Sequence, residues 1–304
     1  MDVLFVPGGT YAGSFRPFVT MSRNLLPFDL PERRRYDGSL VGLRLRALSI
    51  SQARTFRRAA GVIFLTDTAK AIVTARTGHL AGRTAVIPHG IAGPFFAAPR
   101  VQRDLSAYEP AAPFKWIYVS IVDLYKHQAR VAEAVAILRG RGLPVSIDFI
   151  GPAYPPALKE LQTALARIDP ASEFVRYRGP IPYTDLPAAY QSADGAVFAS
   201  SCENMPNILL ESMASGLPIA CSNRSVMPEV LGDAGVYFDP ESASDIAAAL
   251  ETLFRDTDLR ARSAAKAYER ASRYSWERCA QQTFDFIARV TAPGGCNQAN
   301  SALT

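Results

Sequence analysis

The chain has 304 residues, of which 48% are hydrophobic and 20% are charged, and its formal net charge is +5. This length and composition predict a soluble globular protein of roughly two domains. No apolar run approaches the ~18 residues that a bilayer span requires, and the N-terminal stretch MDVLFVPGG has no basic segment before its short apolar run. Neither a membrane span nor a signal peptide is therefore indicated, and we expect a cytoplasmic protein.

The charge is unevenly distributed along the chain. Residues 1–100 contain 14 Lys and Arg against 5 Asp and Glu, a net charge of +9, whereas the remainder contains 19 against 23, a net charge of −4. This division predicts two bodies with different partners, of which the first faces an anionic surface such as phospholipid, on the inner face of the membrane, or a phosphorylated acceptor. We expect no nucleic-acid partner. The cysteines form no CxxC pair, which predicts reduced thiols rather than disulfides or zinc ligands; they are Cys202, Cys221, Cys279 and Cys296.

Short aliphatic or β-branched runs alternate with helical patterns, which is typical of parallel α/β architecture. In the first hundred residues the expected strands are 3–7, 62–66 and 85–90, and the expected helix is 40–60. The segment 92–113 contains proline and alanine with little periodicity, so we place a domain linker there.

From residue 116 onward the alternation of strand and helix is regular. The expected strands are 116–122, 145–151, 174–179, 195–200, 219–222 and 236–238. The expected helices are 127–141, 155–168, 184–192, 206–215, 243–255 and 258–272. This order predicts a doubly wound sheet, which binds ligands at the carboxyl ends of its strands.

One such loop opens the segment CENMPNILLESMASGLP, residues 202–218, in which Glu203 and Glu211 flank an otherwise apolar strip. Pro206 suits a first helical position and Gly216 suits a left-handed helix end. Glu203 then lies in the loop before the helix, and Glu211 lies on its second turn. Both carboxylates are therefore predicted to face the same crevice.

Between them, the free backbone N–H groups of Asn207, Ile208 and Leu209 stand at the positive end of the helix dipole, which predicts a seat for phosphate. A carboxylate beside that seat accepts bonds from hydroxyls, so Glu211 suits a ribose and Glu203 suits a group beyond the diphosphate. In the alternative interpretation Glu203 is a capping acid and Glu211 a solvated helix residue. A glycosidase is rejected because its two carboxylates flank the scissile bond, whereas here a phosphate seat separates them.

The block SSCENMPNILLESMASGLPIACSNRSVMPEVLGDAGVYFDP resembles the signature of the retaining GT-B glycosyltransferases of family four, the E-x7-E enzymes. The likeness extends over 85–290: AVIPHGI resembles the hinge segment, and SWERCAQQTFDFI resembles a closing helix that packs back on the N-terminal domain. The stretch PGGTYAGSFRPFVTMSRNLLPFD resembles members that build bacterial surface polysaccharides. The resemblance implies a fold of two Rossmann-like doubly wound domains.

Carried over by position, the resemblance implies that Glu203 contacts hydroxyls of the donor sugar, Glu211 holds the ribose, and Lys126 meets the phosphates. It further implies that the main chain from Met205 to Leu209, including Asn207 and Ile208, holds the diphosphate and that the backbone of Ile181 meets the base. On the acceptor or phosphate side the candidates are Gly9, Thr10 and Arg23.

The sequence departs from the family pattern at several points. Ser120 and Ile121 stand where the family commonly has a Gly-Arg dipeptide, so one cation is missing unless Arg130 or Arg23 replaces it. No active-site histidine follows the first strand, and none of the three histidines has the setting of a catalytic base. Neither an acidic pair nor a His/Cys cluster suggests a metal, and no cofactor is expected beyond the donor substrate.

We therefore expect a cytoplasmic, peripheral transferase that moves a sugar from a nucleoside diphosphate sugar to a saccharide or lipid-linked saccharide with retention, in bacterial surface polysaccharide synthesis. The alternative is an impaired fragment that only binds nucleotide or nucleotide sugar. The expected parts are a partial N-terminal domain, 1–95; a nucleotide-sugar domain, 96–274; a closing helix, 275–290; and a flexible tail, 291–304. Because the first domain is short for this fold, some 70–90 further residues are expected upstream, a length inferred from the balance of a two-domain fold.

Overall fold

The computed structural model describes residues 3–291 and divides into two compact units. Unit 1 comprises the described residues up to Gly90 together with those from Ser275 onward, and unit 2 is Ile91–Tyr274. The division thus falls at Gly90 rather than at the expected residue 95. The expected tail lies outside the described residues except for Thr291, which ends the last helix.

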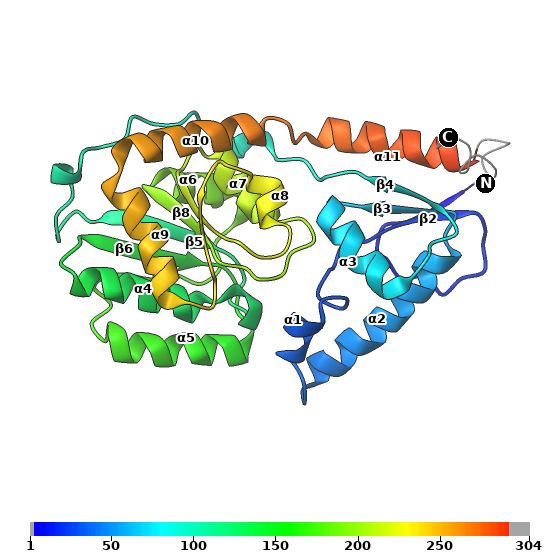
Figure 1. Cartoon of the computed structure of the whole chain (residues 1–304), viewed down its shortest axis with the longest axis horizontal. Coiled ribbons are helices and arrows are strands. Elements are labelled where there is room, and N and C mark those ends of the chain that lie inside the picture. The colour runs from blue at the N-terminus through cyan, green and yellow to red at the C-terminus, as the bar shows by residue number, and fades with distance from the viewer. Residues whose placement is uncertain (1–2, 292–304) are drawn as a thin grey trace, which may run out of the picture. The chain divides into compact units, whose positions relative to one another are not determined.

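Unit 1 is built on a parallel sheet with the strand order β1-β2-β3-β4. Its strands are β1 (Leu4–Val6), β2 (Phe18–Met21), β3 (Gly61–Phe64) and β4 (Arg83–Val86). Its helices are α1 (Leu30–Arg34), α2 (Leu40–Arg58), α3 (Asp67–Thr77) and α11 (Trp276–Thr291). Helices α2 and α3 lie on one face of this sheet and α11 lies on the other (Figure 1).

Three elements of unit 1 are absent from the sequence-based prediction: α1, β2 and α3. Strand β2 is fully buried between β1 and β3, but its four residues are too short a run to show a period. Helix α3 begins after Thr66, whose side chain accepts a bond from the Ala69 N–H. This N-cap was a readable signal in the sequence.

Helix α11 packs directly on the sheet of unit 1. The ring of Phe286 is 3% exposed, and a side chain at Gly61 would come within 2.9 Å of Phe286 and Val290. At its N-terminal end, Trp276 lies against the ring of His89 at 5.2 Å. Only glycine at position 61 lets the helix approach strand β3 this closely.

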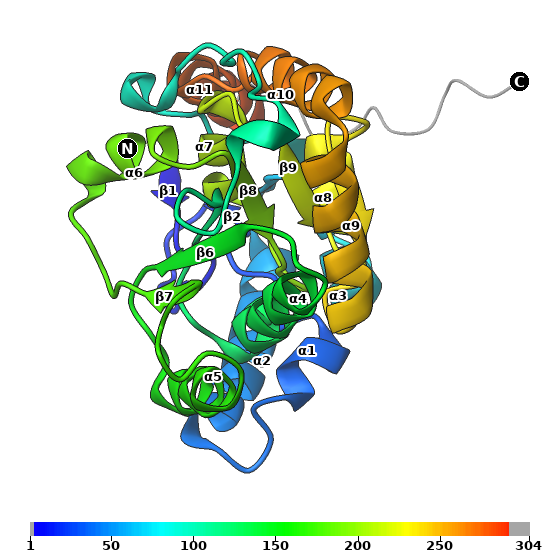
Figure 2. The ribbon, with the colours of Figure 1, turned by 90° about the vertical axis from the view of Figure 1, so that its left-hand side faces the viewer.

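Unit 2 is a six-stranded parallel sheet with the order β10-β9-β8-β5-β6-β7. Its strands are β5 (Phe114–Val119), β6 (Val145–Ile150), β7 (Val175–Tyr177), β8 (Gly195–Phe198), β9 (Ile219–Ser222) and β10 (Val236–Phe238). Its α-helices are α4 (Gln128–Gly140), α5 (Pro155–Ile168), α6 (Leu186–Gln191), α7 (Asn207–Ala214), α8 (Met227–Leu231), α9 (Ala243–Arg255) and α10 (Thr257–Ala271). Helices α4 and α5 cover one face and α6, α7 and α10 the other, with α9 beside α4 (Figures 1 and 2).

The order of strands creates one reversal in unit 2. The chain enters at β5, adds β6 and β7 on one side, and then returns to add β8, β9 and β10 on the other. Strands β5 and β8 are therefore neighbours, with Trp116 opposite Gly195 and Ile117 opposite Ala196. In an open parallel sheet the crevice at such a reversal, beyond the carboxyl ends of the strands, is where ligands bind.

The expected linker is wrong. Residues 92–113 belong to unit 2 and include two 3-10 turns, η1 (Gly93–Phe95) and η2 (Leu105–Ala107). Phe95 is 1% exposed, and the Ala97 N–H donates to the Ala214 carbonyl at 3.0 Å. The sequence of this segment shows no periodicity because the segment packs on unit 2 as irregular chain, not because it is a free linker.

Two further features concern the described residues as a whole. Cys202, Cys221 and Cys279 are buried free thiols, and Cys296 lies outside the described range. Among residues 3–291, no helix is both long and apolar enough to cross a bilayer.

Candidate active site

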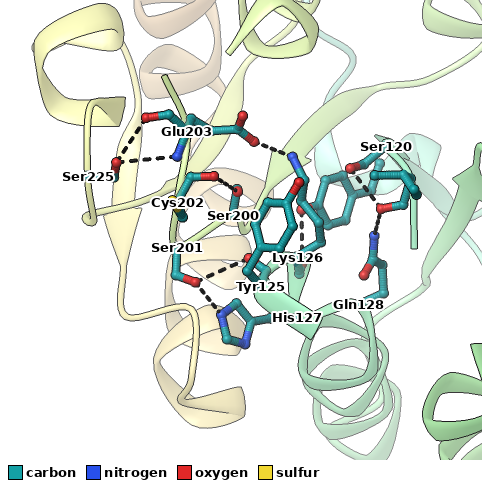
Figure 3. A network of polar contacts seen from close by, with 12 residues as sticks. Ser120, Tyr125, Lys126, His127, Gln128, Ser200, Ser201, Cys202, Glu203 and Ser225 are labelled. Carbon is teal, nitrogen blue, oxygen red and sulfur yellow. Dashed lines mark hydrogen bonds and ion pairs between the residues drawn. The ribbon is translucent and has the colours of Figure 1, made fainter. Parts of the chain in front are cut away.

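The loops that follow β5, β8 and β9 meet at the reversal of the unit 2 sheet, where polar side chains link each loop to the next (Figure 3). The first loop carries Lys126, the second carries Glu203, and the third carries Ser225. These strands are adjacent in the sheet, so their carboxyl ends open into one region.

The central contact is an ion pair between Lys126 Nζ and Glu203 Oε1 (Figure 3). The two side chains are 5% and 16% exposed. The ammonium group also lies 5.0 Å from the ring centre of Tyr125 and 5.2 Å from that of Phe198. The carboxylate and the two rings thus offset part of the cost of burying this cation.

The backbone around Lys126 is anchored from two neighbouring strands. Residues Leu124–Lys126 form a 3-10 turn, η3, capped by the Asp123 carboxylate. The buried Tyr118 hydroxyl on β5 donates to the Lys126 carbonyl at 2.9 Å. After β8, the Ser201 N–H donates to the Tyr125 carbonyl at 2.9 Å. These bonds fix the backbone position from which the Lys126 side chain extends.

Glu203 is held through its backbone by Ser225. Its N–H donates to Ser225 Oγ at 3.3 Å, and the same hydroxyl donates to the Glu203 carbonyl at 3.2 Å (Figure 3). The side chain of Glu203 is thereby left to point toward Lys126.

Helix α7 begins at Asn207, with Pro206 in the N-cap position rather than in the first turn. The prediction that the Asn207 N–H is free to bind phosphate is wrong, because this group donates to the Met205 carbonyl at 3.0 Å. The first helical bond then runs from the Leu210 N–H to Pro206. In the described chain the N–H groups of Ile208 and Leu209 donate to no backbone carbonyl.

The other end of the helix agrees with its sequence. Gly216 has φ +66°, and a side chain there would come within 2.6 Å of the Ala97 carbonyl oxygen. Glycine is thus required both by the left-handed conformation and by the close approach of the chain.

Glu211 lies on the second turn of α7 and is 8% exposed. Its Oε1 accepts a hydrogen bond from the Tyr183 hydroxyl at 3.1 Å. Burial raises the pKa of Glu211 from 4.5 to about 7, and the bond from Tyr183 opposes part of that rise. Burial, followed by the charge of Glu211, raises the pKa of Tyr183 to about 12. The interpretation of Glu211 as a solvated helix residue is therefore wrong.

Sequence reasoning missed Tyr183. It stands two positions after Ile181, in the 3-10 turn η4 (Tyr183–Asp185), and its ring lies 5.2 Å from that of Phe95. Ile181 itself is half-buried and follows Gly179, whose φ is +70°. A tyrosine in the loop already singled out for the base was the available signal.

The remaining candidates lie elsewhere. Gly9 and Thr10 follow β1, and Arg23 follows β2, so all three stand at the carboxyl edge of the unit 1 sheet. Arg130 is bonded to Glu133 at 2.8 Å and is half exposed, which makes it a poor replacement for the missing cation. In the part of the chain that the structure describes, no group of three or more His, Cys, Asp or Glu could hold a metal ion.

The family comparison decides the class. The model for "Glycosyl transferases group 1" matches residues 107–270, which is more than half of the chain. The chain belongs to this family. The matched segment includes β5 through α10 almost entirely, and hence Lys126, Glu203 and Glu211.

Two curated relatives are similar over part of this segment. O-antigen chain mannosyltransferase B of Escherichia coli is 37% identical over 112 residues, which are 37% of this chain and 29% of that protein. A D-inositol 3-phosphate glycosyltransferase of Corynebacterium kroppenstedtii is 32% identical over 146 residues, 47% of this chain and 32% of the relative. The matched region thus spans about a third of these relatives' length.

Solved structures show the fold. The Anabaena protein HepE in complex with UDP-glucose has a TM-score of 0.73 at 19% identity, covering 90% of this chain and 72% of that one. Sucrose-phosphate synthase of Thermosynechococcus elongatus has a TM-score of 0.72 at 18% identity, covering 92% and 69%. The fold class is accordingly α/β of the GT-B type, with two Rossmann-like units.

Proposed function

We propose that this chain is a retaining glycosyltransferase that moves a sugar from a nucleoside diphosphate sugar to a saccharide acceptor. The observation that carries the proposal is the Lys126–Glu203 pair, placed at the reversal of the unit 2 sheet and followed directly by the N-terminus of α7. Membership in the glycosyl transferases group 1 family supports the class of reaction.

The adjacency of Lys126 and Glu203 matches the chemistry of a donor. In a nucleoside diphosphate sugar, the last phosphate and the sugar that it carries are bonded neighbours, so a cation for the phosphate and a carboxylate for the sugar hydroxyls belong side by side. An ammonium group has three N–H donors, and Lys126 can therefore meet a phosphate oxygen without releasing Glu203. The N–H groups of Ile208 and Leu209, with the dipole of α7, supply the remaining positive potential.

In the same proposal the nucleoside lies toward Glu211. Its carboxylate accepts bonds from the ribose hydroxyls, and the backbone of Ile181 meets the base. The Tyr183–Glu211 bond supports this assignment, because Glu211 Oε1 is there an acceptor for a hydroxyl group.

The reaction then needs no nucleophile from the protein. The acceptor oxygen attacks the anomeric carbon from the face that the diphosphate leaves, the bond between that carbon and the phosphate oxygen breaks with its electron pair, and the departing diphosphate takes the acceptor proton. Orientation and stabilisation of the growing phosphate charge by Lys126 and α7 supply the catalysis. The front-face course retains the anomeric configuration.

The acceptor side of the proposal is a saccharide of bacterial surface polysaccharide, carried by lipid and met at the anionic inner face of the membrane. The likeness to an O-antigen mannosyltransferase supports the acceptor class. Helix α2 supports the anionic surface, since it contains no acidic residue and exposes apolar side chains beside arginines. The exposed apolar residues are Leu40, Leu43 and Ile50, at 85%, 62% and 55%.

The test is to titrate the purified chain calorimetrically with UDP, GDP and their sugar conjugates, and then to measure transfer and product anomer by NMR with saccharide acceptors. Binding together with transfer and retention supports the proposal. Binding without transfer would favour the alternative, a protein that only binds nucleotide sugar. Transfer with inversion would contradict the front-face mechanism.

A further inference from the structure

Left-handed backbone conformations cluster at the ion pair. Among the described residues, three that are not glycine have positive φ: His127 at 54°, Ser172 at 55° and Ser225 at 53°. His127 follows Lys126 directly, and the Ser225 hydroxyl bonds to both the N–H and the carbonyl of Glu203. Ser172 lies in an exposed turn between α5 and β7. Side chains disfavour this conformation, so its persistence beside both members of the pair calls for a compensating role.

The hydroxyl of Ser225 makes two bonds to one residue. Its oxygen accepts from the Glu203 N–H at 3.3 Å, and its proton goes to the Glu203 carbonyl at 3.2 Å. The loop after β9 is thereby hydrogen-bonded to the loop after β8 at Glu203 (Figure 3). The left-handed backbone conformation of Ser225 directs its short side chain toward the backbone of Glu203.

His127 makes the corresponding link on the lysine side. Its Nε2 lies 2.9 Å from Ser201 Oγ, and Ser201 Oγ lies 3.2 Å from the Tyr125 carbonyl oxygen. Because a carbonyl only accepts, the serine proton goes to Tyr125, and the imidazole N–H donates to the serine oxygen. The ring therefore ties the residue after Lys126 to the loop that leads to Glu203.

We propose that Ser225 and His127 are positioning residues that set the height and direction of Glu203 and Lys126 before the donor binds. The proposal rests on the proposed function and deepens it, because it names what aligns the carboxylate with the sugar and the ammonium group with the phosphate. Neither residue touches the substrate in this account. Misplacing a catalytic group by about 1 Å can cost on the order of 100-fold in rate.

The test compares substitutions that separate the effect of the Ser225 hydroxyl from the effect of the left-handed backbone conformation. Ser225→Gly removes the hydroxyl and relieves the left-handed strain, whereas Ser225→Cys removes most of the hydrogen bonding and keeps the strain. Both are expected to lower kcat by about 10-fold to 100-fold with little change in the Kd of the nucleoside diphosphate. Ser172→Gly is the matched control, with the same substitution at the same φ outside the site, and it should leave kcat unchanged.

For His127 the corresponding variant is His127→Gly, which accepts the left-handed conformation and loses the ring. It is expected to lower kcat in the same way, and Ser201→Ala, which removes the acceptor of the ring N–H, should lower kcat to a similar extent. A loss of thermal stability in these variants with an unchanged kcat would show a purely structural role and overturn the proposal.

A readout without turnover keeps this inference separate from the proposed function. The Glu203 amide should exchange with solvent faster in Ser225→Gly than in Ser172→Gly, because it has lost its acceptor. If the unmodified chain transfers no sugar, the proposed function fails, and unchanged exchange at Glu203 would in addition overturn the positioning role. If the chain is active and the Ser225 variants match the control in both exchange and kcat, only the positioning role is wrong.

Discussion

Lys126 and Glu203 form an ion pair although they lie 77 positions apart in the chain, one after β5 and one after β8. Their side chains are 5% and 16% exposed, so each is the main counter-charge of the other in a region of low polarity. The same contact therefore bears on both activity and stability, and the two effects can be separated by substitution.

Substitutions of the two glutamates of the motif should affect transfer and binding differently. Glu203→Gln is expected to lower transfer by ~10²–10³-fold with nucleotide binding nearly intact, because the carboxylate acts where charge develops on the sugar. Glu211→Gln is expected to weaken the nucleotide itself. Steady-state kinetics and calorimetric titration of both variants check this. Equal, modest effects on binding with no effect on turnover would show that the assigned roles are wrong.

Lys126 should discriminate between phosphorylated and unphosphorylated ligands. Lys126→Ala removes the cation nearest the predicted phosphate seat, so it is expected to weaken a nucleoside diphosphate far more than the nucleoside. Calorimetry with both ligands measures the difference. The matched control is Lys159→Ala, at an exposed lysine of α5, which should affect neither ligand. Equal loss for both ligands in the Lys126 variant would place the lysine outside the phosphate site.

Breaking the buried pair should also destabilise unit 2. Glu203→Gln leaves the buried Lys126 ammonium group without its counter-charge, and the expected cost is about 3 kcal/mol. Chemical denaturation measures it. The control is Asp233→Asn, which breaks the exposed pair with Lys266 and should change the unfolding free energy very little. A Glu203 variant as stable as that control would mean that the pair is not the counter-charge system described above.

The raised pKa of Glu211 predicts a pH dependence with a definite sign. Between the ordinary value of 4.5 and the folded value of about 7, the folded protein binds a proton that the unfolded chain has lost. Stability from this group is therefore greatest below about pH 4.5, falls as the pH rises toward 7, and is level above that. Glu211→Gln should be more stable than the unmodified protein at pH 8, and the difference should shrink toward pH 5.

Denaturation of both proteins across this range checks the sign, with Glu160→Gln, at an exposed position of α5, as the control. Tyr183→Phe extends the test. Because the tyrosine hydrogen bond lowers the pKa of Glu211, its loss should move the midpoint to higher pH. A midpoint that moves downward, or a Glu211 variant less stable at pH 8, would contradict the desolvation account.

Helix α2 should bind anionic bilayers. Three of its arginines have partners within unit 1, Arg46 with Asp37, Arg57 with the Thr77 carbonyl and Arg58 with the Gly13 carbonyl. Arg44 and Arg54 are exposed as well. Flotation with phosphatidylglycerol vesicles at low salt should recover the protein, and high salt or phosphatidylcholine should release it. Leu43→Ser together with Ile50→Ser should weaken binding, since apolar insertion adds to the charge effect.

The matched control for the bilayer experiment is Val101→Ser, at a residue of unit 2 that is 96% exposed. Binding that ignores both lipid charge and the α2 substitutions would show that this face is only a solvated helix surface.

Local chain properties determined much of the architecture in advance. The bounds of α5, β9, β10 and α9 follow directly from periodicity, caps and breakers, because those signals depend on neighbours within a few residues. The same holds for the C-terminal end of α7 at Gly216, and for the placement of Glu203 and Glu211 on either side of the N-terminus of that helix.

Only the tertiary structure decided what these residues contact. No spacing states that β8 lies beside β5, and this strand order brings Lys126 to Glu203 across 77 positions. Two further contacts depend on how loops from separate strands meet at one edge of the sheet. They are the Tyr183–Glu211 bond, across 28 positions, and the bond of Ser225 to the Glu203 backbone. Burial, and with it the raised pKa of Glu211, arises from the same assembly, because desolvation is a property of packed surroundings rather than of the chain's own sequence.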